Sequence, residues 1–212
     1  MPWHCKPYYG YLKESTEAKD NAIEIAEILH RNGWTVNAIA GMLGNVGNES
    51  AYNPWLWEMQ QPGSTEPDIL ASTDTELIAN SNHHGYGLFQ FTPAGKYIYD
   101  QYAQSYQGYG PNFSDIPGSY LDGQAQVIFV HYHADYAPTP TYPYTYQEYK
   151  ESDDMPEYLA AVWFFNYERG AAWGVERATD ARYWYDFLVD YFDDDTKKKK
   201  WKWIYYLKRR RF

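Results

Sequence analysis

Glu49 has the clearest potential for acid–base chemistry in this 212-residue chain. It lies in the sequence GNES, at the expected end of a helix that begins after Thr35. A carboxyl group near a helix C-terminus faces the negative end of the helix dipole, which disfavours its charged form. Apolar neighbours such as Trp55, Trp57 and Phe89 would add desolvation in the same direction. Both effects favour a carboxyl that keeps its proton near neutral pH and acts as a general acid.

Metal-dependent and thiol chemistry fit the sequence less well. His131 and Asp135 share a helix face at i, i+4, but His133 would point to a different face. Because no third ligand stands at a recognisable spacing, we expect no metal site, and we expect no cofactor. The single cysteine, Cys5, falls in an irregular N-terminal arm, which argues against a thiol nucleophile.

Helical periodicity surrounds Glu49. One apolar stripe begins at Thr16 and stops at Asn32-Gly33, and a second helix follows the N-cap Thr35 and ends near Glu49. Three glycines lower the helix propensity of the second helix by about 1 kcal/mol each relative to alanine. It must therefore be buried and closely approached by its neighbours. These glycines are Gly41, Gly44 and Gly47.

The rest of the chain is also mostly helical in pattern. Helical spacing recurs at 94–106, 122–136, 156–167 and 176–192, and 137–146 is typical of an extended Pro/Tyr loop. The glycine-rich HHGYGLFQF at 83–91 predicts a small β-hairpin. The predicted fold class is therefore mainly α, with one β-hairpin element after the helix that carries Glu49.

Charge divides the chain unevenly. Half of the 18 Lys and Arg lie in 197–212, which contains no acid, so 28 Asp and Glu face only nine basic residues in 1–196. This acidic body argues against a nucleic-acid partner. We expect an irregular arm at 1–15, one domain at 16–192 and an acidic-then-basic aromatic tail at 193–212. No apolar run approaches the roughly 20 residues of a membrane-spanning helix.

Three separated segments together resemble the phage tail lysozyme family, within the wider lysozyme and lytic-transglycosylase group. The first, AIAGMLGNVGNESAYNPWLWE at 38–58, is similar to the family's Glu-Ser motif closing a glycine-bearing helix. The second, GYGLFQFTP at 85–93, is similar to its Gly-Leu-x-Gln hairpin motif. The third, FNYERG at 165–170 followed by RATDARYWYDF, resembles its late aromatic motif and closing helix. The resemblance implies a lysozyme-like α+β domain over roughly residues 20–190.

The resemblance also implies a site. Glu49 becomes the catalytic acid, and residues from all three motifs line or support a sugar cleft. Gln90 offers a carbonyl and an amide to sugar hydroxyl or N-acetyl groups from a hairpin wall. The implied substrate-binding residues are Ser50, Tyr86, Gln90, Phe91, Asn166 and Tyr167.

A second carboxylate is not assigned by the sequence. Retaining glycosidases place two carboxyl groups about 5 Å apart, and inverting ones place them roughly 6.5–9.5 Å apart. One Glu alone also suffices in some members of the family that the chain resembles. The candidates are Glu58, Glu66, Asp68, Asp74, Glu76 and Glu168.

Three functions follow from the resemblance. The first is a muramidase that hydrolyses peptidoglycan between N-acetylmuramic acid and N-acetylglucosamine. The second is a lytic transglycosylase, in which the muramyl 6-hydroxyl replaces water at the same bond. The third is a non-catalytic wall-binding module. Retention of both Glu49 and Gln90 argues against the third, because binding alone needs no protonated acid.

Partners and location are expected to match this role. The partners are peptidoglycan glycan strands and, for a virion component, phage tail proteins. The tail at 197–212, with nine cations and five aromatic residues, would contact an anionic cell surface. The N-terminus lacks a secretory signal, so we expect synthesis in the host cytoplasm and action on the cell wall.

Overall fold

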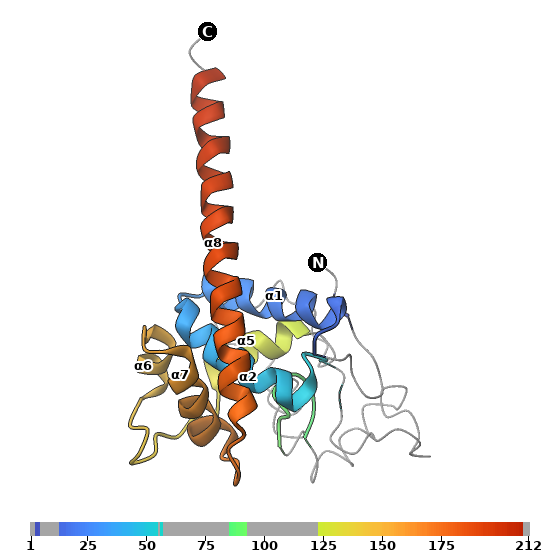
Figure 1. The fold of residues 1–212 in the computed structure, drawn as a ribbon, viewed down its shortest axis with the longest axis vertical. Coiled ribbons are helices and arrows are strands. Elements are labelled where there is room, and N and C mark those ends of the chain that lie inside the picture. Colours follow the sequence, from blue (N-terminus) through green and yellow to red (C-terminus); the bar gives the residue numbers. More distant parts are fainter. Residues whose placement is uncertain (1–2, 5–12, 55, 57–84, 93–122, 210–212) are drawn as a thin grey trace.

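The computed structural model describes residues 3–4, 13–54, 56, 85–92 and 123–209. This part is predominantly helical (Figure 1). Its elements are α1 (Thr16–Arg31), α2 (Val36–Ser50), α5 (Gly123–His133), α6 (Tyr146–Glu151), α7 (Pro156–Trp163), a π-helix η2 (Phe164–Glu168) and α8 (Val175–Arg209). Within these residues, none of the helices has the length and apolar content needed to cross a membrane.

The two helices before Glu49 begin and end where the sequence predicts. The Ser15 side chain caps α1 by accepting a hydrogen bond from the Ala18 amide at 3.2 Å. Thr35 caps α2 in the same way, at 3.1 Å from the Ala38 amide. The α2 helix ends at Ser50, because Ala51 adopts the left-handed conformation.

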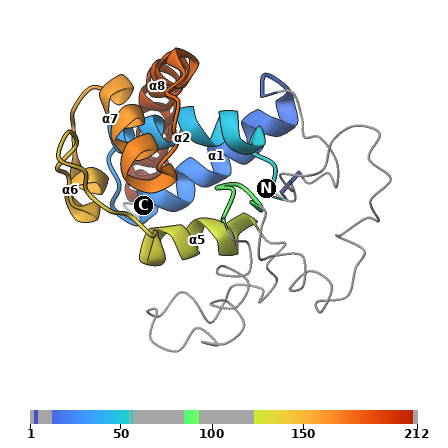
Figure 2. The ribbon, with the colours of Figure 1, turned by 90° about the horizontal axis from the view of Figure 1, so that it is seen from below.

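The α2 helix is the buried centre of the fold. It lies between α1 on one side and α7 and α8 on the other (Figure 2). A Cβ atom on Gly41 would lie 2.8 Å from the Leu159 Cβ of α7, and one on Gly44 would overlap the Arg177 carbonyl oxygen of α8. The close approach predicted from the glycines is confirmed, and it brings the backbone of α8 against α2.

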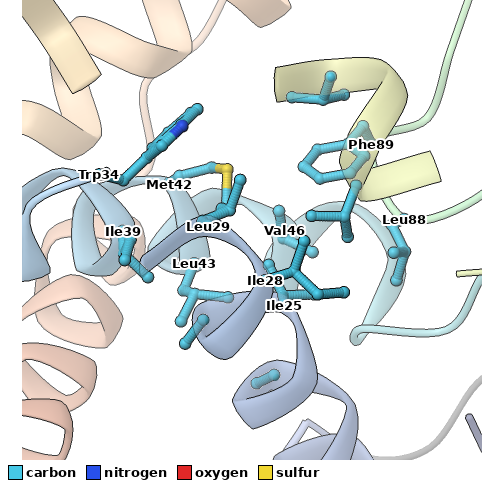
Figure 3. Close-up of a cluster of buried hydrophobic side chains, with 14 of the residues drawn as sticks. Ile25, Ile28, Leu29, Trp34, Ile39, Met42, Leu43, Val46, Leu88 and Phe89 are labelled. Atoms are coloured by element: carbon cyan, nitrogen blue, oxygen red, sulfur yellow. The ribbon is translucent and has the colours of Figure 1, made fainter. Parts of the chain in front are cut away.

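The core beside α2 is built from aliphatic stripes that meet one another. Ile25 and Leu29 of α1 point toward Leu43 and Val46 of α2, and all four side chains are almost fully buried (Figure 3). Burial of each such side chain contributes roughly 1.5–3 kcal/mol. Phe89, which belongs to the segment 85–92, adds its ring to this core (Figure 3).

Residues 85–92 form a tight turn. Tyr86 and Phe91 exchange two backbone hydrogen bonds, of 3.3 and 2.9 Å, which close the turn. Gly87 has a φ of 78° and Gln90 a φ of 44°, so the chain reverses through left-handed backbone. The predicted β-hairpin is not shown, since the described residues contain no strand, and its first residues, 83–84, lie outside that part, as does the helix predicted at 94–106.

The C-terminal half agrees with most of the predicted pattern. Helices predicted at 122–136 and 156–167 are found as α5 and as α7 continued by η2. Residues 137–145 are irregular, as predicted for the Pro/Tyr loop. The short α6 that follows was not predicted. It begins with a capping box in which Thr145 and Glu148 bind each other's backbone amides.

The last helix is longer than its predicted span of 176–192. Its contacts with α1 extend to Tyr191, which donates to Glu27 at 2.7 Å, and Phe192, which stacks on His30 at 4.2 Å. Beyond this point the helical backbone projects away from the body and continues to Arg209 (Figure 1). The tail predicted at 193–212 therefore begins as a continuation of α8.

Candidate active site

Glu49 lies at the end of α2 and binds an arginine of α8. Its Oε1 accepts a hydrogen bond of 2.7 Å from an Arg177 terminal nitrogen. The Glu49 side chain is 26% exposed and that of Arg177 is 13% exposed. The acid candidate therefore reaches solvent, while its partner is largely enclosed.

Arg177 also binds a second carboxylate. Its other terminal nitrogen lies 3.2 Å from an Oε2 of Glu168, the last residue of η2, and 3.2 Å from Oδ1 of Asn45 on α2. The guanidinium lies over the Phe164 ring, 4.8 Å from its centre. One cation thus holds two carboxyl groups that come from different helices.

Glu168 is the more deeply buried of the two acids, with its side chain 10% exposed. Burial and the nearby Glu49 charge raise its pKa well above the usual value, and Arg177 offsets this only in part. Direct contact with the Glu49 side chain raises it further. The nearby Trp163 indole N–H lowers the pKa of Glu168, but its effect is smaller than those of burial and of Glu49. Within the described residues this N–H makes no hydrogen bond of normal geometry. Burial and the adjacent charge therefore favour the protonated form of Glu168.

The sequence of this chain matches a known family over most of the domain that holds these groups. Residues 20–188 match the sequence model of the phage tail lysozyme family. The chain belongs to the phage tail lysozyme family. The resemblance predicted from the three motifs is confirmed.

A relative of this phage tail lysozyme family member is found in a bacteriophage. "Morphogenesis protein 1" of Bacillus phage B103 is 30% identical over 191 residues, which cover 88% of this chain. The match covers 43% of that protein, so the chain spans less than half the length of this relative.

Four of the predicted substrate-binding residues are buried in this phage tail lysozyme fold, and two of them, Ser50 and Asn166, make buried side-chain hydrogen bonds. Ser50 is 1% exposed, and its hydroxyl donates a hydrogen bond of 2.9 Å to the Leu88 carbonyl. Asn166 is fully buried, where its amide donates to the Tyr136 hydroxyl and the Tyr142 carbonyl and its oxygen accepts from the Thr139 amide. These contacts favour a supporting role, and direct sugar contact stays a prediction.

The other predicted residues surround the 85–92 turn. The Gln90 side-chain amide donates a hydrogen bond of 3.0 Å to the Gly87 carbonyl and one of 3.2 Å to the Leu56 carbonyl. The Gln90 side chain is half-buried. Tyr86 and Phe91 are buried. Tyr167 packs 4.4 Å from the Trp163 ring centre and 6.5 Å from that of Phe89. The Tyr167 ring of η2 therefore packs against Phe89 of the turn.

Some elements of the predicted site lie outside the described residues. These are Trp55 and Trp57 as apolar neighbours, and Glu58, Glu66, Asp68, Asp74 and Glu76 as second carboxylates. Of the candidates for a second carboxylate, only Glu168 is described, and it lies next to Glu49.

Arg177 is the functional residue that the sequence reasoning missed. It belongs to the quoted third segment, nine residues after Glu168, but no local pattern distinguishes a bridging arginine from one on a solvated helix face. The usable signal was a cation in the first turn of the helix predicted at 176–192.

The histidine tested for metal binding has a packing role. Nδ1 of His131 accepts a 2.9 Å hydrogen bond from the Trp34 indole, and burial lowers the pKa of His131 to about 4. In the described part of the chain, no three His, Cys, Asp or Glu side chains are grouped as metal ligands.

Proposed function

We propose that this chain is a peptidoglycan-cleaving glycosidase, a muramidase in which Glu49 donates the proton to the glycosidic oxygen. One observation carries the proposal. A solvent-reaching carboxyl at the end of α2 shares a guanidinium with a buried carboxyl whose pKa is raised by burial and by the adjacent Glu49 charge. Membership of the phage tail lysozyme family supports the substrate class.

The proposed reaction uses the site in a simple order. Protonation of the oxygen between N-acetylmuramic acid and N-acetylglucosamine lets the C–O bond break, and the sugar ring takes up positive charge. The ionised Glu49 carboxylate, held by Arg177, then stabilises that charge. Water adds to the sugar carbon, and the proton that it loses returns to the carboxyl site, which completes the hydrolysis.

Glu168 is a poor fit for the opposing carboxylate of a double-displacement or water-activating mechanism. Those mechanisms separate their carboxyl groups by about 5 Å or by roughly 6.5–9.5 Å, with sugar or water between them. Glu168 instead contacts Glu49 directly and binds the same arginine. The proposal therefore gives Glu49 the acid role without an assigned second carboxylate.

The phage relationship supports a proposed place of action. The relative in phage B103 is named for morphogenesis, which supports a virion component that acts on the wall. We propose that this chain works as a tail-associated enzyme, with glycan strands as substrate and tail proteins as partners. The predicted need for neither metal nor cofactor is part of this proposal.

Digestion of purified peptidoglycan, followed by mass spectrometry of the new ends, tests the proposal. A muramidase leaves reducing ends and adds one water for each bond cut. A lytic transglycosylase leaves 1,6-anhydro ends, lighter by one water, and would replace the hydrolase proposal. A wall-binding module produces no new ends.

Glu49→Gln is the control for this digestion. The amide keeps the size of the side chain but has no carboxylic proton, so the rate should fall by about 100-fold or more. A folded Gln variant that digests peptidoglycan at the native rate would exclude Glu49 as the acid.

A further inference from the structure

The Glu49–Arg177–Glu168 cluster is unbalanced in charge unless it carries a proton. Two carboxylates face one guanidinium, at 2.7 and 3.2 Å. Net negative charge in a largely enclosed site is costly, since little water screens it. One proton on either carboxyl makes the cluster neutral.

Among the described residues, the groups that face the cluster supply no further compensating cation. From α2, Asn45 contributes a neutral amide oxygen. From α8, the next acidic side chain is Asp180, which is occupied by Lys13 at 2.6 Å and by the Asn48 amide. From η2 and α6, Tyr167 and Tyr149 lie within electrostatic reach of Glu168, and burial raises the pKa of both hydroxyls, so both are neutral.

We propose that Glu49 and Glu168 share one proton, that Arg177 neutralises whichever carboxyl is ionised, and that Glu168 is a positioning residue that stores the proton for Glu49. The inference rests on the proposed role of Glu49 as the acid. It assigns a function to the second carboxyl, which the glycosidase mechanism does not use directly.

The transfer balances in atoms and charge. At rest Glu168 carries the proton and Glu49 is the carboxylate bound by Arg177. The proton moves from a Glu168 oxygen to a Glu49 oxygen, and the second Arg177 nitrogen then neutralises the Glu168 carboxylate. Glu49 passes the proton to the glycosidic oxygen. A proton released by the attacking water restores the resting state.

Burial explains why the store is Glu168. Its side chain is the less exposed of the two, and its raised pKa results mainly from that burial and from the adjacent Glu49 charge. Glu49 reaches solvent and is the carboxyl that a substrate can contact. The proton is therefore held on the enclosed side and delivered on the open side.

The first test is the pH dependence of kcat/KM on peptidoglycan. Glu168→Gln removes the store but keeps its shape, so Glu49, paired with Arg177 alone, should release its proton at lower pH. The alkaline limb should move to lower pH by about one unit or more, which is a tenfold loss or more at a fixed pH on that limb. Arg177→Gln should move the limb in the opposite direction. Equal activity loss at every pH in Glu168→Gln would overturn the inference.

Glu157→Gln is the matched control. Glu157 and Arg182 form a comparable pair between α7 and α8, at 2.6 and 2.8 Å, with no contact to the cluster. Removing this acid should leave the pH profile unchanged. A shift of the alkaline limb as large as that in Glu168→Gln would show that loss of any ion pair to α8 moves the pH profile. That result would contradict a specific role for Glu168.

The second test needs no substrate. With ¹³C-labelled glutamate, NMR titration of the wild-type protein should show one carboxyl still protonated at pH 7, and Glu168→Gln should remove that signal. Two carboxyls that both ionise in the ordinary range would overturn the inference, even if Glu49→Gln abolishes cleavage. A retained proton in a protein that cuts no glycan would instead contradict the proposed function and leave the shared proton standing.

Discussion

The Ser50 hydroxyl donates a 2.9 Å hydrogen bond to the Leu88 carbonyl, and this bond ties the last residue of α2 to the 85–92 turn. It lies directly beside Glu49 in the chain. The bond therefore sets the position of the acid relative to the turn that carries Gln90.

Ser50→Ala should loosen this connection. The Leu88 carbonyl loses its bond to the buried hydroxyl, which costs about 1–3 kcal/mol, and the melting temperature should fall by about 2–4 °C per kcal/mol. Activity per folded molecule should also fall, because Glu49 is less well positioned. Differential scanning calorimetry and peptidoglycan turnover measure the two effects. Ser152→Ala, at an exposed Ser152–Asp154 hydrogen bond, should change neither, and an unchanged Ser50→Ala would contradict the prediction.

Gln90→Ala should weaken catalysis more than stability. The side chain is half-buried and binds two backbone carbonyls of the turn, so its loss should cost no more than about 1–2 kcal/mol. Gln90→Gly is the matched variant, because glycine accepts the φ of 44° and should be about 1 kcal/mol more stable than alanine there. Denaturant unfolding and turnover distinguish the roles. A collapse of stability with intact activity in the folded fraction would make Gln90 purely structural.

Gly44→Ala should damage the site through packing. The added Cβ would meet the Arg177 carbonyl and lie 2.9 Å from the Ala181 amide nitrogen, so α8 must shift away from α2. Such overpacking costs about 1–3 kcal/mol, against about 1 kcal/mol gained in helix propensity. Gly33→Ala is a useful comparison, because nothing lies within 4 Å of its Cβ and its cost comes from a φ of 87°. Only Gly44→Ala should lower turnover per folded molecule, and equal turnover in both would disprove the link.

His131 should make the folded state less stable in acid. Its pKa is about 4 in the folded protein because of burial and the Lys150 charge, against about 6.5 in the unfolded chain. The unfolded state therefore binds the proton first, and stability falls as the pH drops from about 6.5 to about 4. His131→Gln keeps an acceptor for the Trp34 indole but cannot titrate. Urea unfolding at pH 7 and pH 5 should show a smaller loss in the variant, and equal losses would contradict the assignment.

Removing residues 197–212 should abolish salt-sensitive surface binding. The segment holds nine cations, and each contributes about 1 kcal/mol near an anionic membrane surface. Sedimentation with phosphatidylglycerol vesicles, at low and high salt, measures the binding. Turnover of soluble glycan fragments should not change. A full-length variant with Lys197 to Lys200 replaced by Gln should show an intermediate loss. Binding that resists both the deletion and salt would exclude an electrostatic anchor.

The parts of the fold that the sequence predicted are those set by local rules. The capping of α2 by Thr35 and its end near Glu49 follow from side-chain-to-backbone hydrogen bonds and from apolar spacing. The role of Gly44 was predicted only as close packing, because the identity of the neighbour depends on a contact more than 130 residues along the chain.

In the candidate site, too, local features could be predicted from the sequence and contacts between distant segments could not. Glu49 was predicted from its motif and its helix end, and its role as the acid stays a prediction. The contacts of Arg177 and the raised pKa of Glu168 depend on three helices meeting, and on burial that no single segment encodes. The α6 helix was missed for a different reason, since its six residues, adjoining a Pro/Tyr-rich stretch, are too few to show periodicity.

The unbroken course of α8 gives the protein a long helical projection that begins at the carboxyl pair. Arg177 lies in the first turn of this 35-residue helix, which rises about 50 Å to Arg209 at 1.5 Å per residue. No glycine or proline interrupts it, so it contains none of the residues at which helices usually bend. A partner that binds the far end of α8 therefore sets both the distance of the carboxyl pair from the binding point and the orientation of that pair.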